Sequence, residues 1–569
     1  MTPILDRLQA TTLDRLAIDE IGIPAAVLME RAGYAVARAM RALLRRQDAS
    51  MRTALSICGL GNNGADAVVA ARYLHGWNVP VEIVVVGAPA GAKPELRAQL
   101  AIAERLGIAA SFIEGTGTSP GTGAHAAFEE ALARRYAIID GLFGTGLSRP
   151  LEGFVHDVVV RLVALDRPTV SVDIPSGVDA DTGQILGVAI RAHTTVSFQF
   201  PKLGHVLFPG RAHAGRLVVA DIGLPPSLLP SVLGEVPKSS SVSESSSVSD
   251  LSKTQGAYRL DRGAALEAFP ARPPDVHKGT FGHLLIAAGT AYRPGAALLV
   301  GRAALRAGVG LATLASDVAT IQSVAPVLDE VMGLPISADD VESRAEKLID
   351  ALRSRSALAM GPSLEPTRET AEMVRRVLES CVEVPAVVDA GALVALAEPS
   401  ASTADLRLRW LRDRVGDTVL TPHPGEMARL LGIPVAEVQR ARVEVARRLA
   451  GETGTHVVLK GASTVVASPS GTVFISLAGN PGMATGGSGD VLTGVVGALL
   501  ARGVGGALAA RAGVWLHACA GDLAARTKGS GLIARDIIGC LPKALQLVAK
   551  EGRGRGRDGG ASFSSGIGG

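Results

Sequence analysis

The stretch Asn480-Pro481-Gly482-Met483-Ala484-Thr485-Gly486-Gly487-Ser488-Gly489-Asp490 runs directly into an apolar segment, residues 491–500. Glycines in front of a helix leave backbone N–H groups free to bind an anion, and the helix dipole adds to the attraction. An aspartate in the first helical turn stands beside such an anion and can accept a proton from an attacking hydroxyl. No Gly-Lys-Ser/Thr follows, so this is not a Walker P-loop. The stretch therefore predicts phosphoryl transfer to a hydroxyl. The plain structural alternative is a capped helix.

Short apolar runs alternate with helical segments on both sides of a serine-rich stretch, and this rhythm is typical of parallel sheets covered by helices. The expected strands are 53–58, 81–86, 137–139 and 169–172 in the first half, and 283–288, 357–360, 386–388, 418–420, 456–459 and 472–475 in the second. An amphipathic helix is expected over 25–44. We therefore predict two α/β domains, each a three-layer sandwich: residues 1–228 (Rossmann-like) and residues 258–550. A linker (229–257) joins them and a disordered tail (551–569) follows.

Polar residues at the predicted strand ends of the second half build a cleft around the glycine-rich turn. Lys460 to Thr464 follow one strand, the segment containing His423 follows another, and Gly361 and Asp389 follow two more. A lone His or Lys would be a weak signal. Because parallel strands place their carboxyl ends at one edge, these segments together predict a nucleotide site.

In the first half, strand 53–58 leads into Gly59-Leu60-Gly61-Asn62-Asn63-Gly64-Ala65-Asp66. The glycine spacing, with Glu82 on the next strand, permits an NAD-binding interpretation. A purely steric role for the glycines is the alternative. Asn62 and Asn63 instead suit a polar ligand or a hard cation bound through oxygen. Asp140 and Asp173 follow apolar strands and are predicted to be functional, whereas Asp179 and Asp181 are predicted to stabilise a turn.

The bulk composition excludes several classes of protein. The 569-residue chain has a net charge of only +3, which argues against general nucleic-acid binding. Its apolar residues form no charge-free run long enough to span a membrane, and the N-terminus lacks the pattern of a secretory signal. The four cysteines are far apart, in keeping with a reducing cytoplasm. We expect a cytoplasmic protein that binds neither membrane nor nucleic acid and forms a homo-oligomer.

The first-half motifs, together with Leu28 to Gly33, resemble the NAD(P)H-hydrate epimerase domain of the YjeF N-terminal family over about residues 5–228. This resemblance implies exchange of the R and S forms of hydrated NADH and NADPH, with K⁺ held by Asn63, Asp140 and Ser176. It further implies that Asp173 is catalytic and contacts the hydrate. The other implied hydrate contacts are Asn62, Asn63, Gly64, Ala65, Asp66, Gly144, Thr145, Gly146, Leu147, Ser148, Arg149 and Pro150.

The second-half motifs resemble the ribokinase-like, ADP-dependent (S)-NAD(P)H-hydrate dehydratase family over about residues 258–550. This implies a lyase that uses ADP and Mg²⁺ to phosphorylate the hydrate and then loses phosphate. Asp490 would be the base. The implied hydrate contacts are Ala296, Gly361, His423 and Asp490, and the implied nucleotide contacts are Lys460, Gly461, Ala462, Ser463, Thr464, Gly487, Ser488 and Gly489.

The chain departs from both patterns in small ways. Ala65 and Ala67 flank Asp66 where the epimerase family usually has glycines, so we expect a rearranged turn if those positions need positive φ. Ser363 and Ser463 stand where dehydratase relatives often differ. The expected function is a bifunctional metabolite-repair enzyme, an isomerase fused to a lyase. Two alternatives are a ribokinase-fold kinase of a vitamin-precursor alcohol and an N-terminal binding module without activity.

Overall fold

The computed structural model describes residues 1–115, 122–234, 256–336, 340–397 and 408–552, and the chain divides near Ala257 into two compact units. The serine-rich stretch and the tail predicted from the sequence lie largely outside these residues. Two elements reach into the expected linker: α9 (Leu229–Leu233), which buries Leu233, and the start of β9 (Ala257–Leu260).

The N-terminal unit is built around one parallel sheet in the order β4-β3-β2-β5-β6-β7-β8. Its strands are β2 (Ala54–Cys58), β3 (Val81–Val86), β4 (Ala110–Ile113), β5 (Ala137–Gly141), β6 (Thr169–Val172), β7 (Thr194–Phe198) and β8 (Arg216–Ala220). The main helices are α1 (Arg7–Arg15), α2 (Ala25–Leu44), α3 (Asn62–Gly76), α4 (Pro94–Arg105), α5 (Thr122–Arg134) and α6 (Gly153–Leu165). Two one-turn helices, α7 (Leu203–Val206) and α8 (Gly210–His213), follow β7.

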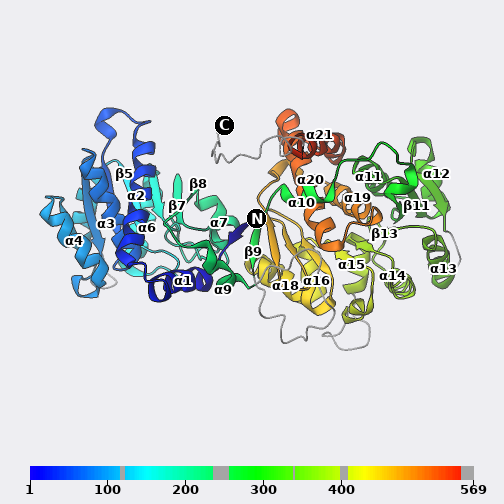
Figure 1. The fold of residues 1–569 in the computed structure, drawn as a ribbon, viewed down its shortest axis with the longest axis horizontal. Helices are drawn as coiled ribbons and strands as arrows, with labels where there is room; N and C mark the ends of the chain where they lie inside the picture. Colours follow the sequence, from blue (N-terminus) through cyan, green and yellow to red (C-terminus); the bar gives the residue numbers. More distant parts are fainter. Residues whose placement is uncertain (116–121, 235–255, 337–339, 398–407, 553–569) are drawn as a thin grey trace. The chain divides into compact units, whose positions relative to one another are not determined.

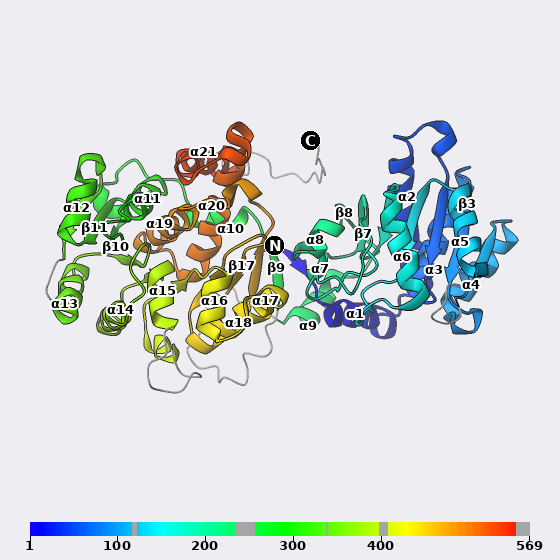
Figure 2. The ribbon, with the colours of Figure 1, turned by 180° about the vertical axis from the view of Figure 1, so that it is seen from behind.

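The strands of this sheet are buried on both faces because helices cover each side. Alternate strand residues such as Ile83 and Val85 pack with α2, α3 and α4, while Val84 and Val86 pack with α5 and α6. Helices α2 and α3 are seen in the view of Figure 1, and α5 and α6 are seen in the opposite view of Figure 2. This three-layer arrangement confirms the predicted fold class of this half and explains its continuous apolar runs.

The C-terminal unit has a second sheet, in the order β9-β18-β17-β16-β15-β14-β13-β10-β11-β12. Pairing is parallel from β16 to β12 and antiparallel along β16, β17 and β18. The strands after β9 are β10 (His283–Ala287), β11 (Leu311–Ser316), β12 (Met332–Pro335), β13 (Ala357–Met360), β14 (Ala386–Val388), β15 (Thr418–Leu420), β16 (His456–Leu459), β17 (Val465–Ala467) and β18 (Val473–Ser476).

Helices cover both faces of this sheet as well. One group consists of α10 (Gly263–Ala268), α11 (Gly295–Arg306), α19 (Ser488–Ala501), α20 (Gly506–Lys528) and α21 (Ala534–Gly552). The opposite group consists of α13 (Val341–Leu352), α14 (Arg368–Ser380), α15 (Ala390–Ala397), α16 (Pro424–Leu431), α17 (Val435–Arg440) and α18 (Arg442–Thr453), and α12 (Val318–Val324) lies by the β11–β12 edge (Figure 1). Helix α19 is buried almost throughout, from Val491 to Ala501, because it packs between the sheet and its neighbours α11 and α20.

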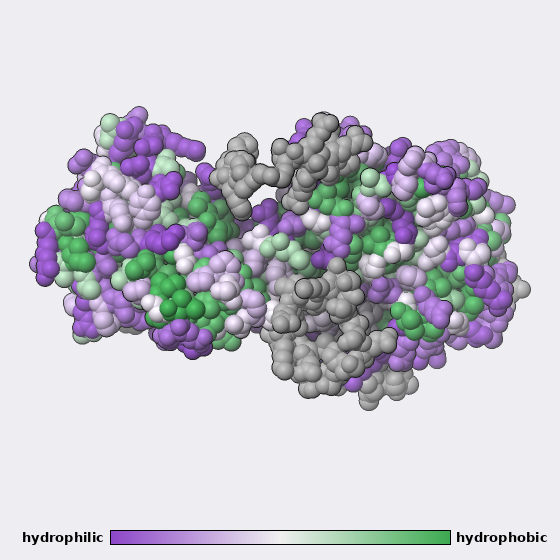
Figure 3. Space-filling model, viewed as in Figure 1, coloured by the Kyte–Doolittle hydropathy of each residue, from purple (hydrophilic) through white to green (hydrophobic). Residues whose placement is uncertain are grey.

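The surface mixes polar and apolar side chains. On the face shown in Figure 3, hydrophilic residues are interspersed among smaller hydrophobic areas. Within the described part of the chain, no helix combines the length and the apolar character that a membrane span requires.

Candidate active sites

The asparagine-rich turn of the N-terminal unit forms the start of α3. Gly64 fits there because a Cβ atom at this position would lie 2.0 Å from the carbonyl oxygen of Gly59. Ala65 and Ala67 are helical and fully buried, and neither has a positive φ. The condition for a rearranged turn is therefore not met: both positions have helical backbone, for which alanine is well suited. The methyl group of Ala67 fills the space beside Gly141.

Asp140 is buried near the carboxyl end of β5 beside Ser176, and Asn63 lies against the adjacent residue Gly141. Its carboxylate accepts hydrogen bonds from Ser171 Oγ (2.7 Å), Ser176 N (2.9 Å) and Ser176 Oγ (2.5 Å). Burial raises the pKa of Asp140, and the hydrogen bonds from Ser176 and Ser171 oppose this rise. The side chain of Asn63 lies against Gly144, and its amide nitrogen is buried without a partner among the described residues. The sheet edge thus brings together the three residues predicted to bind a cation.

Asp173 follows β6 and forms a buried ion pair with Lys202. The Nζ atom of Lys202 lies 2.5 Å from Asp173 Oδ1 and also donates to Ser197 Oγ (3.1 Å). Asp173 has a φ of 61°, which is unusual for a residue other than glycine and is often found at functional sites. The charge of Asp173 also reaches Asp66, whose pKa is raised well above its ordinary value, first by burial and then by Asp173.

His205 adds a neutral ring to this cluster. Its Nδ1 atom accepts a hydrogen bond from Lys202 N (2.9 Å), and burial together with the Lys202 charge lowers its pKa to about 4. The ring is therefore uncharged at neutral pH. Asp66, Asp173, Lys202 and His205 form one polar cluster beside the Asn62–Asp66 turn.

The loop Gly144–Pro150 borders this site at the end of β5. Leu147 turns inward to the core, whereas Ser148, Arg149 and Pro150 are exposed. Glu82 cannot serve as the acidic residue of an NAD site, as one interpretation of the first half required. It lies near the amino end of β3 and is buried against Arg134, with a shortest contact of 2.6 Å.

In the C-terminal unit, the glycine-rich stretch caps α19 as predicted. Gly487 has a φ of 86°, and a Cβ atom there would lie 2.4 Å from Leu299 Cδ1. The next three residues, Ser488, Gly489 and Asp490, form the first helical turn. Ser488 Oγ lies 3.3 Å from Nε2 of His517, a buried ring whose pKa burial lowers to about 4. This contact joins the first turn of α19 to α20.

A network of charged groups lies beside this turn, at the carboxyl ends of β14, β15 and β16. Lys460 Nζ lies 2.6 Å from Asp389 Oδ1 and 3.8 Å from Glu426 Oε2, and Thr493 Oγ1 donates to Asp389 Oδ2 at 2.6 Å. Burial alone would lower the pKa of Lys460, but the charges of Asp389 and Glu426 outweigh it and raise this pKa. The ammonium group therefore stays charged.

Asp490 lies beside this network, in the first turn of α19. Burial raises its pKa to about 6, the Asp389 charge adds to the rise, and Lys460 opposes it. A carboxylate with this pKa is ionised at neutral pH and basic enough to accept a proton there.

The loop after β16 approaches the same edge. Gly461 has a φ of 128° and Ser463 a φ of 56°, so the chain turns sharply between Lys460 and Thr464. Arg442 donates to the carbonyl oxygens of Leu459 (3.1 Å) and Lys460 (3.0 Å), and burial lowers the pKa of Arg442 to about 10.

The residues predicted to contact the hydrate come from three further elements. His423 caps α16, with its Nδ1 accepting from Gly425 N (3.0 Å) and Glu426 N (3.2 Å). Its side chain is 56% exposed, so a ligand can still reach it. Ala296 lies in the first turn of α11. Gly361 follows β13 with a φ of 126°, and a Cβ atom there would lie 1.8 Å from Asp389 O.

Sequence reasoning did not single out Lys202, His205, Glu426 or Thr493. Lys202 and His205 follow β7, a strand that the sequence analysis did not identify, and polar residues just after that strand were the available signal. Glu426 stood within a quoted segment, but only the fold brings its carboxylate to Lys460.

These features define a class: a two-domain α/β protein whose second unit carries a helix-capping anion site with an adjacent base, as ribokinase-like enzymes do. Family comparison then makes the assignment specific. The family model for NAD(P)H-hydrate dehydratase matches residues 284–543, and that for the YjeF-related protein N-terminus matches residues 25–204. The chain belongs to the family of bifunctional NAD(P)H-hydrate repair enzymes, with an epimerase N-terminal domain and a dehydratase C-terminal domain.

Relatives match over nearly the whole chain. The bifunctional NAD(P)H-hydrate repair enzyme Nnr of Thermofilum pendens is 37% identical, with 95% of each chain covered. That of Moorella thermoacetica is also 37% identical, over 96% of this chain and 98% of the relative. Among solved structures, the ADP/ATP-dependent NAD(P)H-hydrate dehydratase of Bacillus subtilis, co-crystallised with ATP/Mg²⁺, is 31% identical over 51% of this chain and 98% of that chain, with a TM-score of 0.44.

Proposed function

We propose that the two units catalyse successive steps in the repair of hydrated NADH and NADPH. The N-terminal unit exchanges the R and S hydrates, and the C-terminal unit converts the S hydrate to NAD(P)H while ADP becomes AMP and phosphate. The observation that carries the proposal is Asp490, a base with a pKa of about 6 in the first turn of α19, beside the Lys460–Asp389 pair.

In the dehydratase step, the hydroxyl oxygen of the hydrate attacks the β-phosphorus of ADP. Asp490 accepts the proton of that hydroxyl group. The bond from that phosphorus to the bridging oxygen breaks, and AMP leaves. The amides of Gly487, Ser488 and Gly489 stabilise the transferred phosphoryl group at the helix N-terminus. Phosphate then departs with the C–O electron pair, and loss of a proton from the neighbouring carbon restores the ring double bond.

The remaining residues of this site bind and orient the two substrates. Lys460 to Thr464 would hold ADP, and Ala296, Gly361 and His423 would line the hydrate site. Mg²⁺ usually binds one or two carboxylates together with substrate phosphates, and Asp389 and Glu426 fit that role beside Lys460. The ion would neutralise phosphate charge when ADP is bound.

In the epimerase step, the carbon that bears the hydroxyl must lose and regain its configuration, which requires proton transfer and stabilisation of a transient cation. Asp173 can supply both, and Lys202 holds its carboxylate in place. The hydrate would lie against the turn Asn62–Asp66 and the loop Gly144–Pro150, which meet at the same sheet edge.

A potassium ion would be held by Asn63, Asp140 and Ser176. The fit rests on oxygen atoms at one sheet edge: the Ser176 hydroxyl lies 2.5 Å from the buried Asp140 carboxylate, and the Asn63 amide oxygen faces Gly144 in the loop that follows β5. A monovalent cation would supply positive charge to this pocket and fix the end of β5 against α3.

The test is an assay of the full chain with ADP and either pure S hydrate or a mixture of R and S hydrates. With the mixture, the NADH formed should correspond to the S half of the added hydrate if epimerisation is absent and to all of the hydrate if epimerisation is present. Conversion that stops at the S half would reject the epimerase assignment. No rise in NADH, with turnover of a vitamin-precursor alcohol instead, would favour a biosynthetic kinase.

A further inference from the structure

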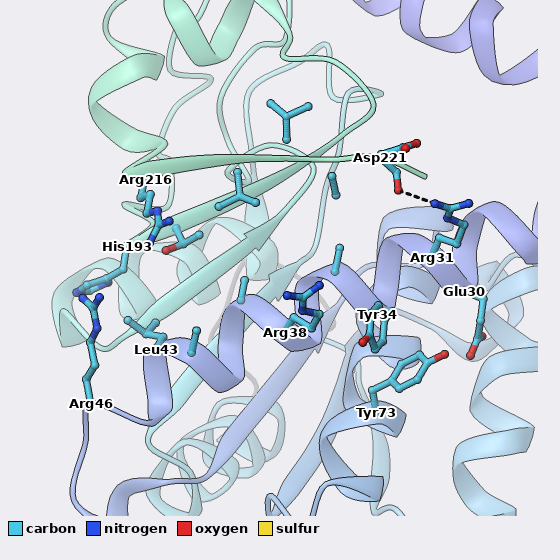
Figure 4. Close-up of a pocket in the computed structure, with 17 residues that line it drawn as sticks. Glu30, Arg31, Tyr34, Arg38, Leu43, Arg46, Tyr73, His193, Arg216 and Asp221 are labelled. Carbon is cyan, nitrogen blue, oxygen red and sulfur yellow. Dashed lines mark hydrogen bonds between the residues drawn. The ribbon is translucent and has the colours of Figure 1, made fainter. Parts of the chain in front are cut away.

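A large groove lies between α2 and the edge strand β8, on a different part of the N-terminal unit from the Asp173 cluster (Figure 4). Its volume is about 910 Å³. Its lining runs along α2 from Glu30 to Arg46, which lies just after the end of the helix. At the helical rise per residue this is a length of about 24 Å. Such a length suits an extended chain of about seven residues better than a compact ligand.

The groove is basic. Four exposed arginines line it: Arg31, Arg38, Arg46 and Arg216. The lining also holds two acidic residues: Glu30 pairs with Arg72 at 3.1 Å, and the Asp221 carboxylate accepts from Gly223 N at 2.8 Å. The four arginines outnumber them, so the groove keeps an excess of positive charge. The excess of positive charge selects an acidic occupant.

His193 strengthens one end of this basic surface. Figure 4 shows its ring between Arg46 and Arg216. The Nδ1 atom of His193 accepts a hydrogen bond from Thr169 N (3.2 Å), so a neutral ring carries its proton on Nε2. That end of the groove consequently offers the Nε2–H group of His193 beside the guanidinium groups of Arg46 and Arg216.

The outer edge of β8 supplies a second, independent feature. Arg216 N donates to His193 O of the segment before β7, so pleating turns the N–H groups of Leu217 and Val219 toward the opposite side. Among the described residues, no strand pairs with that side. Val219 is 44% exposed at this edge. An unprotected apolar edge is a template for strand addition.

We propose that this groove binds an extended acidic peptide segment of a partner protein, which adds to β8 as a further strand and places its carboxylates against the arginines. Pairing of β8 with a second copy of the chain would instead bring two α2 arginine rows to one face, which opposes self-association.

The probe is a fluorescein-labelled heptapeptide of alternating Glu and Val, titrated with the full chain and followed by fluorescence anisotropy. We expect saturable binding that weakens at high ionic strength, and no binding of the same peptide with Lys in place of Glu. The double variant Arg38→Glu/Arg216→Glu should weaken binding about tenfold or more, while Arg97→Glu on exposed α4 should leave it within about twofold.

The variant Val219→Pro tests strand addition. Proline removes an outward-facing N–H without touching the bonds to β7, so we expect binding to be lost while R/S exchange is retained. Equal affinity of the double variant and the unaltered protein would overturn the proposal. So would displacement of the peptide by inorganic pyrophosphate at lower concentration, or a dimer in sedimentation that Val219→Pro dissociates.

Discussion

At the residue scale, the chemistry of the C-terminal unit depends on one carboxylate whose environment keeps its pKa near neutrality. Asp490 is predicted from its position after a glycine run, but its pKa of about 6 arises from burial and from Asp389, which is distant in the sequence. Lys202 shows the opposite case. The polar residues just after β7 were the available signal for it, but only the fold shows that its Nζ atom lies 2.5 Å from Asp173 Oδ1.

Asp490 should give the dehydratase a pH dependence. Because the base must be ionised and its pKa is about 6, the rate should rise through pH 6 and level off above it. Asp490→Asn should reduce turnover about 10²–10⁴-fold at pH 7.5. Initial rates with S hydrate and saturating ADP from pH 5 to 8 check this. A flat profile would contradict the role of Asp490.

The same variant should be more stable than the parent protein. A carboxyl group whose folded pKa is raised from 3.8 to about 6 destabilises the fold as pH rises through this window. Allowing for partial exposure, Asp490→Asn should gain about 1–2 kcal/mol at pH 7.5 and progressively less toward pH 4. Thermal unfolding at both pH values measures it, with exposed Asp329→Asn as the matched control, for which no such gain is expected.

At the element scale, both sites form where a strand ends and a helix begins. Many strands, among them β3, β6 and β13 to β16, have the bounds that their apolar runs predict, because strands buried on both faces must be apolar throughout. The sequence analysis did not identify β4, β7, β8, β9, β11, β12 or β17. Strands β7 and β8 mix Thr, Ser and Arg with apolar residues, and β8, at the edge of the sheet, is only partly buried.

Helix α3 begins so close to the end of β2 that position 64 should accept no residue larger than glycine. In Gly64→Ala, the Cβ atom would lie 2.0 Å from Gly59 O, so the helix start must shift. We expect a loss of about 1–3 kcal/mol of stability in the N-terminal unit and loss of R/S exchange. Gly61→Ala is the control, because nothing lies within 4 Å of its Cβ position. Equal unfolding temperatures of Gly64→Ala and Gly61→Ala would refute the steric argument.

At the scale of the whole molecule, two independently packed units carry two separate sets of polar residues. Asp490→Ala should abolish NADH formation while R/S exchange continues. Asp173→Asn should abolish R/S exchange while NADH still forms from the S hydrate. Chromatographic separation of the R and S hydrates, together with NADH absorbance, reads both activities in the same full-length protein. Loss of both activities in either folded variant would contradict this separation of the sites.

The sequence by itself determined the α/β class, the glycine-rich helix start at Asp490 and the family resemblance of each half, because these depend on local spacing along the chain. Only the tertiary structure decided that Ala65 and Ala67 are helical, that Glu82 pairs with Arg134, and that Lys202 and Glu426 join the sites. It also decided the basic groove beside β8. These features arise where residues far apart in the sequence meet at sheet edges, and burial and pairing there set the charge of each group.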